Sequence, residues 1–283
     1  MSNKTIITVS TLWRYPAKSM MGEELNGASI TMGGVLGDRS YALIDTETNK
    51  VVSAKNPKKW PNFFSFRAAY TMPPESNTVQ PIWITLPDGT VLRSDQADIN
   101  QQLSTFLGRS VTLATQAPEA AELEQYCPEF DGEANEISND AVAGDAAQGS
   151  FFDYSALHLL TTSSIEAMQK LYPEGRFEAK RFRPNMMIDT SGLNGFVEND
   201  WVGKTISIGD TVRLRISDPC PRCVMPTLAQ GDLPADNGIL KHAIAKNRPL
   251  VPFAGKELPS VGVYAQVIQA GWVKRGDIIT IED

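Results

Sequence analysis

Two cysteines three residues apart, Cys220 and Cys223, are the strongest chemical feature of this sequence. Arg222 directly precedes Cys223, and a neighbouring guanidinium lowers a thiol pKa and favours the thiolate that binds soft metals. A thiol–disulfide redox pair is an alternative, but Pro221 and Pro226 leave little room for the helix that such a pair uses. Two half-buried structural thiols at the end of a strand are a further alternative.

The supply of metal-binding side chains is small. The chain has three cysteines and two histidines, which is too few thiolates for an iron–sulfur cluster within this chain. Three cysteines are also too few, and an odd number, for a disulfide-stabilised scaffold. A zinc site that includes His158 and His242 would be badly spaced.

Basic residues and glycines gather in two other stretches and favour anion binding. Arginine suits phosphate because its planar guanidinium can donate two parallel hydrogen bonds, and glycine lets the backbone approach a ligand closely. A solvated basic surface is the alternative, and the spacing is not that of a P-loop. The first stretch includes Tyr15–Ser19 and Gly33–Arg39, and the second includes Arg176, Lys180, Arg181 and Arg183.

Ser155 and His158 could suggest a hydrolase. They lie three residues apart, and the serine lacks the Gly-x-Ser-x-Gly setting of a nucleophile elbow. His158 stands within Ala-Leu-His-Leu-Leu, so we expect it to be a packed strand residue instead.

The overall composition excludes several classes of protein. The net charge is −7, which argues against a nucleic-acid partner. No apolar run is long enough to span a membrane, and the polar N-terminus is unlike a secretory signal, so we expect a cytoplasmic protein. Residues 116–150 have nine acidic side chains and no lysine or arginine; the rest of the chain has 26 basic and 24 acidic residues and could form a basic pocket.

The elements that must position these residues are mostly strands. Alternating or β-branched runs predict strands near 6–13, 40–44, 63–70, 82–86, 91–92, 111–114, 185–189, 205–208, 212–216, 261–268 and 277–281. Helices are predicted over 97–107 and 163–171, the second capped by Ser163 with Glu166 three residues later. The chain is therefore predicted to be mainly β with a few helices, an α+β protein built on a β-barrel.

Residues 116–150 lack periodicity and contain many turn-forming residues, which predicts an acidic linker or surface loop. Because a loop of this length is unusual inside one compact domain, it marks a predicted boundary. The expected organisation is an N-terminal β domain over 1–115, the acidic stretch, and a second domain over 151–283.

These separate motifs occur in an order that resembles the MOSC family with its N-terminal β-barrel domain. The similarity is to the mitochondrial amidoxime-reducing component and its bacterial counterparts, without a ferredoxin domain, and it covers nearly the whole chain. The motifs that carry it are Leu12–Ser19, Gly37–Arg39, Arg181–Asn185, Phe196–Trp201, Ile208–Asp210 and Cys220–Cys223.

The resemblance implies that Cys223 is the catalytic residue that ligates the molybdenum of a molybdopterin cofactor, whose dithiolene supplies two more sulfur ligands. Cys220 would be a supporting residue. The residues that would bind the cofactor are Lys18, Ser19, Arg39, Asp153, Tyr154, Ser155, Arg183, Asn185, Pro221, Arg222 and Tyr264.

The activity implied is a molybdenum-dependent oxidoreductase that reduces small N-hydroxylated compounds, such as amidoximes and hydroxylamino bases. Electrons would come from a separate reductase or ferredoxin-like protein. An alternative within the same resemblance is a sulfur or cofactor carrier that holds a persulfide on Cys223 without turnover.

Overall fold

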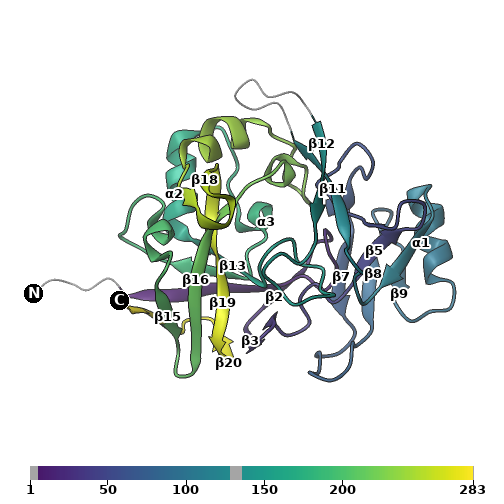
Figure 1. Cartoon of the computed structure of the whole chain (residues 1–283), viewed down its shortest axis with the longest axis horizontal. Helices are drawn as coiled ribbons and strands as arrows, with labels where there is room; N and C mark the ends of the chain where they lie inside the picture. The colour runs from purple at the N-terminus through teal and green to yellow at the C-terminus, as the bar shows by residue number, and fades with distance from the viewer. Residues whose placement is uncertain (1–5, 128–135, 283) are drawn as a thin grey trace, which may run out of the picture.

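A closed β-barrel forms the C-terminal half of the protein in the computed structural model, which describes residues 6–127 and 136–282 (Figure 1). Seven strands follow one another around the barrel, and the last pairs with the first, so the barrel has no free edge. Their order is β14 (Met186–Asp189), β13 (Leu157–Thr161), β19 (Ser260–Gln269), β16 (Val212–Pro221), β15 (Thr205–Ile208), β21 (Ile278–Glu282) and β1 (Ile7–Arg14).

The first strand of the chain closes this barrel. In β1, Leu12 pairs with Met186 of β14 and Ile7 pairs with Ile279 of β21, both antiparallel. Leu12 is fully buried among the barrel residues because alternate side chains of the strand point inward. β1 therefore belongs to the barrel and not to the two sheets of the N-terminal half, although it lies within the predicted 1–115 domain in sequence.

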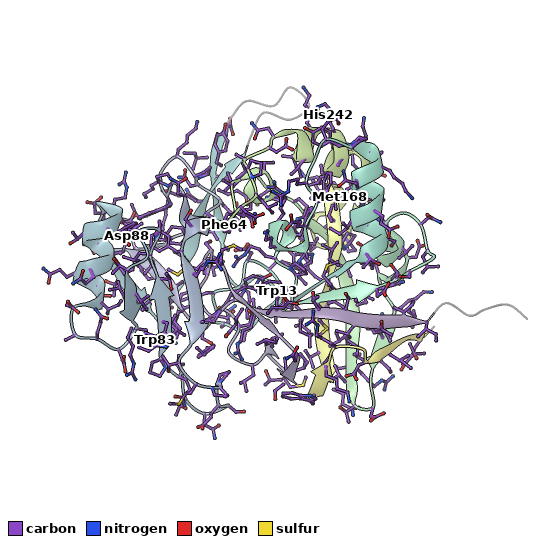
Figure 2. The ribbon with its side chains drawn as sticks, turned by 180° about the vertical axis from the view of Figure 1, so that it is seen from behind. Trp13, Phe64, Trp83, Asp88, Met168 and His242 are labelled. Carbon is purple, nitrogen blue, oxygen red and sulfur yellow. The ribbon has the colours of Figure 1, made fainter. Side chains whose placement is uncertain are left out.

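The N-terminal half has its own apolar core, in which Phe64, Phe66 and Ile84 are buried. In Figure 2, Phe64 and Met168 lie on either side of Trp13, each within its own half. The N-terminal half contains two three-stranded sheets. The first is β10 (Val111–Ala114), β5 (Ala42–Asp45) and β6 (Lys50–Val51), and the second is β7 (Arg67–Tyr70), β8 (Ile82–Thr85) and β9 (Val91–Arg93). Its helices are η1 (Phe63–Ser65) and α1 (Ile99–Leu107).

Short strands connect the two halves or lie at the edge of the barrel. β2 (Glu23–Leu25) pairs with β1, and a small sheet joins β20 (Gly271–Lys274), β3 (Gly27–Thr31) and β4 (Gly34–Val35). A hairpin of β17 (Leu250–Val251) and β18 (Lys256–Glu257) lies beside β16. The predicted fold class, mainly β with a few helices and a β-barrel, is confirmed.

The acidic stretch is not simply a linker. It contains the antiparallel strands β11 (Glu122–Cys127) and β12 (Glu136–Ala141), so the prediction that it lacks regular structure is wrong for these residues. Leu123 is fully buried and packs with Ile44 and Phe151. The Tyr126 N–H donates to Lys55 O at 2.8 Å. These contacts outside the hairpin stabilise strands whose acidic composition disfavours them.

The helices lie on the outside of the barrel. α2 (Thr162–Leu171) begins one residue earlier than predicted. Its N-cap is Thr161 rather than Ser163, and the Thr161 side chain accepts the capping hydrogen bond from Ser164 N. No helix in the described ranges has the length and hydropathy needed to cross a bilayer. The remaining short helices are α3 (Ala179–Phe182), η2 (Val197–Trp201), η3 (Met225–Thr227), η4 (Ile239–Ala243), η5 (Ile244–Lys246) and η6 (Pro252–Ala254).

Candidate functional site

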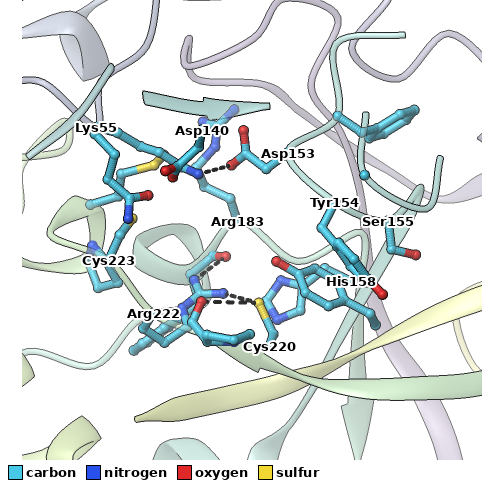
Figure 3. Close-up of a pocket in the computed structure, with 18 of the residues that line it drawn as sticks. Lys55, Asp140, Asp153, Tyr154, Ser155, His158, Arg183, Cys220, Arg222 and Cys223 are labelled. Atoms are coloured by element: carbon cyan, nitrogen blue, oxygen red, sulfur yellow. Dashed lines mark hydrogen bonds and ion pairs between the residues drawn. The ribbon is translucent and has the colours of Figure 1, made fainter. Parts of the chain in front are cut away.

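A cavity of about 600 Å³ lies where the two halves meet (Figure 3). Both halves supply its walls, from the segment after β1 to Tyr264 in β19. Its volume is in the range of small-molecule and cofactor sites. All the residues predicted for the site line it: Lys18, Ser19, Arg39, Asp153, Tyr154, Ser155, Arg183, Asn185, Pro221, Arg222, Cys223 and Tyr264.

The two thiols differ in their surroundings. β16 ends at Pro221, so Cys220 is still part of the strand and is buried, whereas Cys223 follows the strand and is half-buried. Both are free thiols. In Figure 3, Cys223 lies on the side of Lys55, and Cys220 lies beside Arg222 and His158. Cys223 is thus the more accessible thiol of the pair.

Arg222 does lower the pKa of Cys223, as predicted, but burial of the thiol outweighs this effect. Burial raises the pKa of the Cys223 thiol, and the positive charges of Lys55 and Arg222 offset this only in part. Arg222 instead donates from Nη1 to Cys220 Sγ at 2.9 Å and from Nη2 to Phe182 O at 2.7 Å. To stabilise a thiolate at Cys223 would therefore take more positive charge than its sequence neighbour Arg222 supplies.

Lys18, Asp153 and Lys55 form a charged network beside Cys223. Asp153 forms ion pairs with Lys18 and, at 3.2 Å, with Lys55, while Lys18 Nζ also donates to Phe151 O at 2.6 Å. Burial alone would raise the pKa of Asp153, but the two ammonium groups hold it well below its usual range. Burial lowers the pKa of Lys18. The carboxylate thus keeps two lysines at one wall of the cavity.

Arg39 and Arg183 stack on the ring of Tyr15, with guanidinium carbons 4.6 and 4.2 Å from its centroid. Arg183 Nη1 donates to Met20 O at 2.7 Å, and burial lowers the pKa of Arg183 to about 10. Ser19, Arg39 and Arg183 all have left-handed backbone, with φ of 63°, 46° and 54°. Such conformations are disfavoured for these residues and concentrate at functional sites.

Three other lining residues are held by hydrogen bonds within the protein. Asn185 Oδ1 accepts from His158 N at 3.1 Å, and Ser155 Oγ donates to Ala265 O at 3.1 Å. His158 Nε2 lies 3.3 Å from Val261 O, and burial lowers the pKa of His158 to about 3. The expectation that His158 is a packed strand residue is confirmed.

The predicted basic cluster divides into separate environments. Arg176 and Lys180 form surface ion pairs with Asp232, at 2.9 and 2.5 Å. Arg181 is 1% exposed and donates to four backbone carbonyls, including Arg176 O at 2.7 Å, so it stabilises the loop around it. Arg183 lines the cavity, so the two interpretations divide within the cluster: Arg176 and Lys180 form a solvated surface, whereas Arg183 lies where it could contact an anion.

Sequence reasoning missed Lys55, Asp140 and Gln125, which also line the cavity. Lys55 follows Val51–Ala54 without any motif, and its loop is held by a hydrogen bond from Ala54 N to Ser19 Oγ at 3.1 Å. The other two come from the hairpin that was predicted as a linker. Among the residues that the structure describes, six lysines and arginines and two aspartates line the cavity, so this lining is positive within an acidic protein.

Two family models cover most of the chain. The MOSC N-terminal beta barrel domain matches residues 6–133, and the MOSC domain matches residues 146–280. The chain belongs to the MOSC family. MOSC domains are associated with molybdenum-cofactor binding in general. Among the described residues of this MOSC protein, no group of three or more His, Cys, Asp or Glu could hold a metal by itself.

Solved structures with similarity to the MOSC protein share little sequence with it. The YUAD protein from Bacillus subtilis has 10% identity and a TM-score of 0.40, over 97% of this chain and 94% of that one. YiiM from Geobacillus stearothermophilus has 18% identity and a TM-score of 0.31, over 58% and 75%. YiiM from Escherichia coli has 21% identity and a TM-score of 0.30, over 46% and 55%. A search among curated proteins found no match.

Proposed function

We propose that this MOSC protein is a molybdenum-cofactor-binding oxidoreductase that reduces small N-hydroxylated compounds. The observation that carries the proposal is Cys223, a half-buried free thiol that lines a positively charged cavity between two domains. A soft thiolate suits molybdenum that already has sulfur ligands. The cations suit the phosphate of a pterin cofactor.

The residues present fit such a cofactor. The described residues offer no competing cluster of metal ligands, so one protein thiolate plus sulfur from the cofactor is the donor set that this cavity can provide. Cys223 would ligate the metal. Lys18, Arg39 and Arg183 would bind the anionic group, with Ser19, Asp153 and Asn185 holding the loops that carry them.

The overall reaction converts an N–OH group, two electrons and two protons into N–H and water. When bound, the cofactor would supply the two-electron redox chemistry for removing the oxygen. The protein's own residues bind and orient the substrate and exclude bulk water from the cavity. The electrons come from a separate reductase or ferredoxin-like protein.

The test compares molybdenum content and benzamidoxime reduction in the wild type and two single variants. The proteins are purified from a host that makes the cofactor, and reduction is driven by an artificial electron donor. Cys223→Ala is expected to lose both molybdenum and activity. Cys220→Ala, the matched control, is expected to retain most of both.

Wild-type protein without molybdenum, or equal molybdenum in Cys223→Ala, would contradict the proposal. A persulfide on Cys223 with no amidoxime reduction would favour the carrier hypothesis instead. Equal loss of activity in Cys220→Ala and Cys223→Ala would favour a thiol redox pair.

A further inference from the structure

One wall of the cavity is built from a row of aromatic rings. Phe253 and Tyr154 are stacked with centroids 4.1 Å apart, Tyr154 and Tyr264 are 5.4 Å apart, and Tyr264 meets His158 edge-on at 6.1 Å. All four residues line the cavity. They come from two stretches about a hundred residues apart in sequence, 154–158 and 253–264, so this wall exists only in the folded protein.

The outer part of the wall is held in place by its backbone. Tyr154 O accepts hydrogen bonds from Asp145 N at 2.8 Å and Ala146 N at 2.9 Å. A Cβ on Gly144 would lie 2.6 Å from the Tyr154 ring, so this ring packs directly on the backbone. Phe253 N donates to Asp218 Oδ1 at 3.2 Å. The wall is therefore formed before any ligand arrives.

Phe253 has no visible role in the core. Its side chain is 46% exposed, and η6, which contains it, buries none of its residues. Leu258 and Pro259 line the same cavity from the neighbouring segment. An exposed phenyl ring that adjoins an aromatic stack inside a cavity is typical of a ligand-binding surface, whereas single exposed apolar residues elsewhere need no such explanation.

The aromatic wall lies across the cavity from the two lysines, with Arg222 near its inner end at His158 and Tyr264 (Figure 3). In Figure 3, Lys55 and Cys223 lie on one side, and Tyr154, Ser155 and His158 lie on the other. The cationic part suits an anionic cofactor, which leaves the aromatic part for a second ligand. Aromatic faces carry negative charge density, so they favour flat rings that are neutral or cationic over anionic ones.

We propose that this wall is the substrate subsite, that it binds a flat conjugated ring without negative charge, and that Phe253 determines this specificity. The proposal rests on the proposed function and names the substrate class for the same cavity. Tyr154 supports the Phe253 ring from behind by stacking.

The test measures calorimetric binding of two amidines that cannot be reduced, benzamidine with a ring and acetamidine without one. The wild type is expected to bind benzamidine at least about tenfold more tightly, because a stacked ring pair contributes roughly a three- to tenfold change in affinity in addition to its buried area. Phe253→Leu keeps an apolar side chain but removes the ring, and it is expected to weaken benzamidine binding about three- to tenfold without changing acetamidine binding.

Phe106→Leu is the matched control, because Phe106 is a 39% exposed phenylalanine on α1 that does not line the cavity. It is expected to bind both amidines as the wild type does. Equal affinity of the wild type for the two amidines, or an unchanged benzamidine affinity in Phe253→Leu, would overturn the proposal. Binding needs no turnover, so a protein that lacks molybdenum but keeps the ring preference would contradict only the proposed redox function.

Discussion

Arg222 donates a hydrogen bond from Nη1 to Cys220 Sγ over 2.9 Å, although its neighbour in the chain is Cys223. Arg222 Nη2 donates a second hydrogen bond to Phe182 O at 2.7 Å. Cys220 is therefore covered by a guanidinium and is 3% exposed, while Cys223 remains half-buried and free. This contact makes the two thiols chemically different.

The first prediction is that iodoacetamide alkylates Cys223 before Cys220 in the folded protein. Reaction needs access to the sulfur as well as the thiolate, and Cys220 is buried. Because burial raises the pKa of Cys223, its alkylation should accelerate as the pH rises toward and above 9. Trypsin cuts after Arg222, so mass spectrometry can follow each cysteine in a separate peptide. In urea the rates should converge; equal rates in native buffer would contradict the prediction.

A second prediction concerns the acid stability of the barrel. Burial lowers the pKa of His158 to about 3, below the usual value near 6.5, so the folded protein keeps this imidazole neutral. Below about pH 6.5 the unfolded chain binds a proton that the folded protein does not, and the free energy of unfolding falls as the pH drops toward 3. The expected loss from this group is at most about 1.4 kcal/mol per pH unit.

Urea denaturation at several pH values between 7 and 4 measures this loss. The control is His158→Gln, which removes the titration but keeps a hydrogen-bond donor. Its free energy of unfolding should depend less steeply on pH than that of the wild type. Parallel pH profiles for the two proteins would show that His158 does not titrate in this way.

The third prediction is that Gly262→Ala destabilises the barrel next to the site. Gly262 has φ of +76°, and a Cβ there would lie 2.3 Å from His158 Nε2 and 2.5 Å from Leu159 O. The combined backbone strain and overlap should cost about 2–4 kcal/mol of the free energy of unfolding. Gly276→Ala is matched in φ, +84°, but has open space, so it should cost only about 1–2 kcal/mol. Urea titrations measure both changes. If the two variants lost equal free energy of unfolding, the overlap with His158 would not contribute to the destabilisation.

The fourth prediction is that Asp38→Asn weakens the junction that holds the arginine side of the cavity. The Asp38 side chain is buried, accepts from Tyr15 N at 2.7 Å and Asn185 Nδ2 at 2.9 Å, and forms an ion pair with Arg39. An amide in its place loses the charge and presents N–H groups to donors, which should cost about 2–4 kcal/mol.

Thermal and urea denaturation measure the effect of this change. Asp88 provides the control, since it is exposed in the turn before β9 and accepts only a local hydrogen bond from Thr90 N (Figure 2). Asp88→Asn should change the free energy of unfolding by less than about 0.5 kcal/mol. A similarly small change in Asp38→Asn would show that the buried carboxylate does not hold the junction.

Local sequence was sufficient for most strands and for the residues of the site. Strands were predicted near 6–13 and 212–216, and the structure has strands over Ile7–Arg14 and Val212–Pro221, each with one face buried in the barrel. Lys18, Arg183 and Cys223, which the motifs singled out, line one cavity, and their role in binding a cofactor stays a prediction. Family membership followed from the same motifs and is confirmed by two domain matches.

Tertiary structure alone decided which groups face one another. Adjacency in sequence predicted that Arg222 lowers the pKa of Cys223, and its charge does so, but its direct hydrogen bond goes to Cys220, and burial decides the net shift of Cys223. Lys55 enters the site from a loop without a motif, held by Ser19 and by the hairpin that starts at Glu122. Side-chain direction and burial depend on contacts between distant segments, and those contacts have no local signature. The sequence by itself thus determined most of the strands, the family and many of the residues that line the cavity; the fold decided their partners, their pKa shifts and the aromatic wall opposite the lysines.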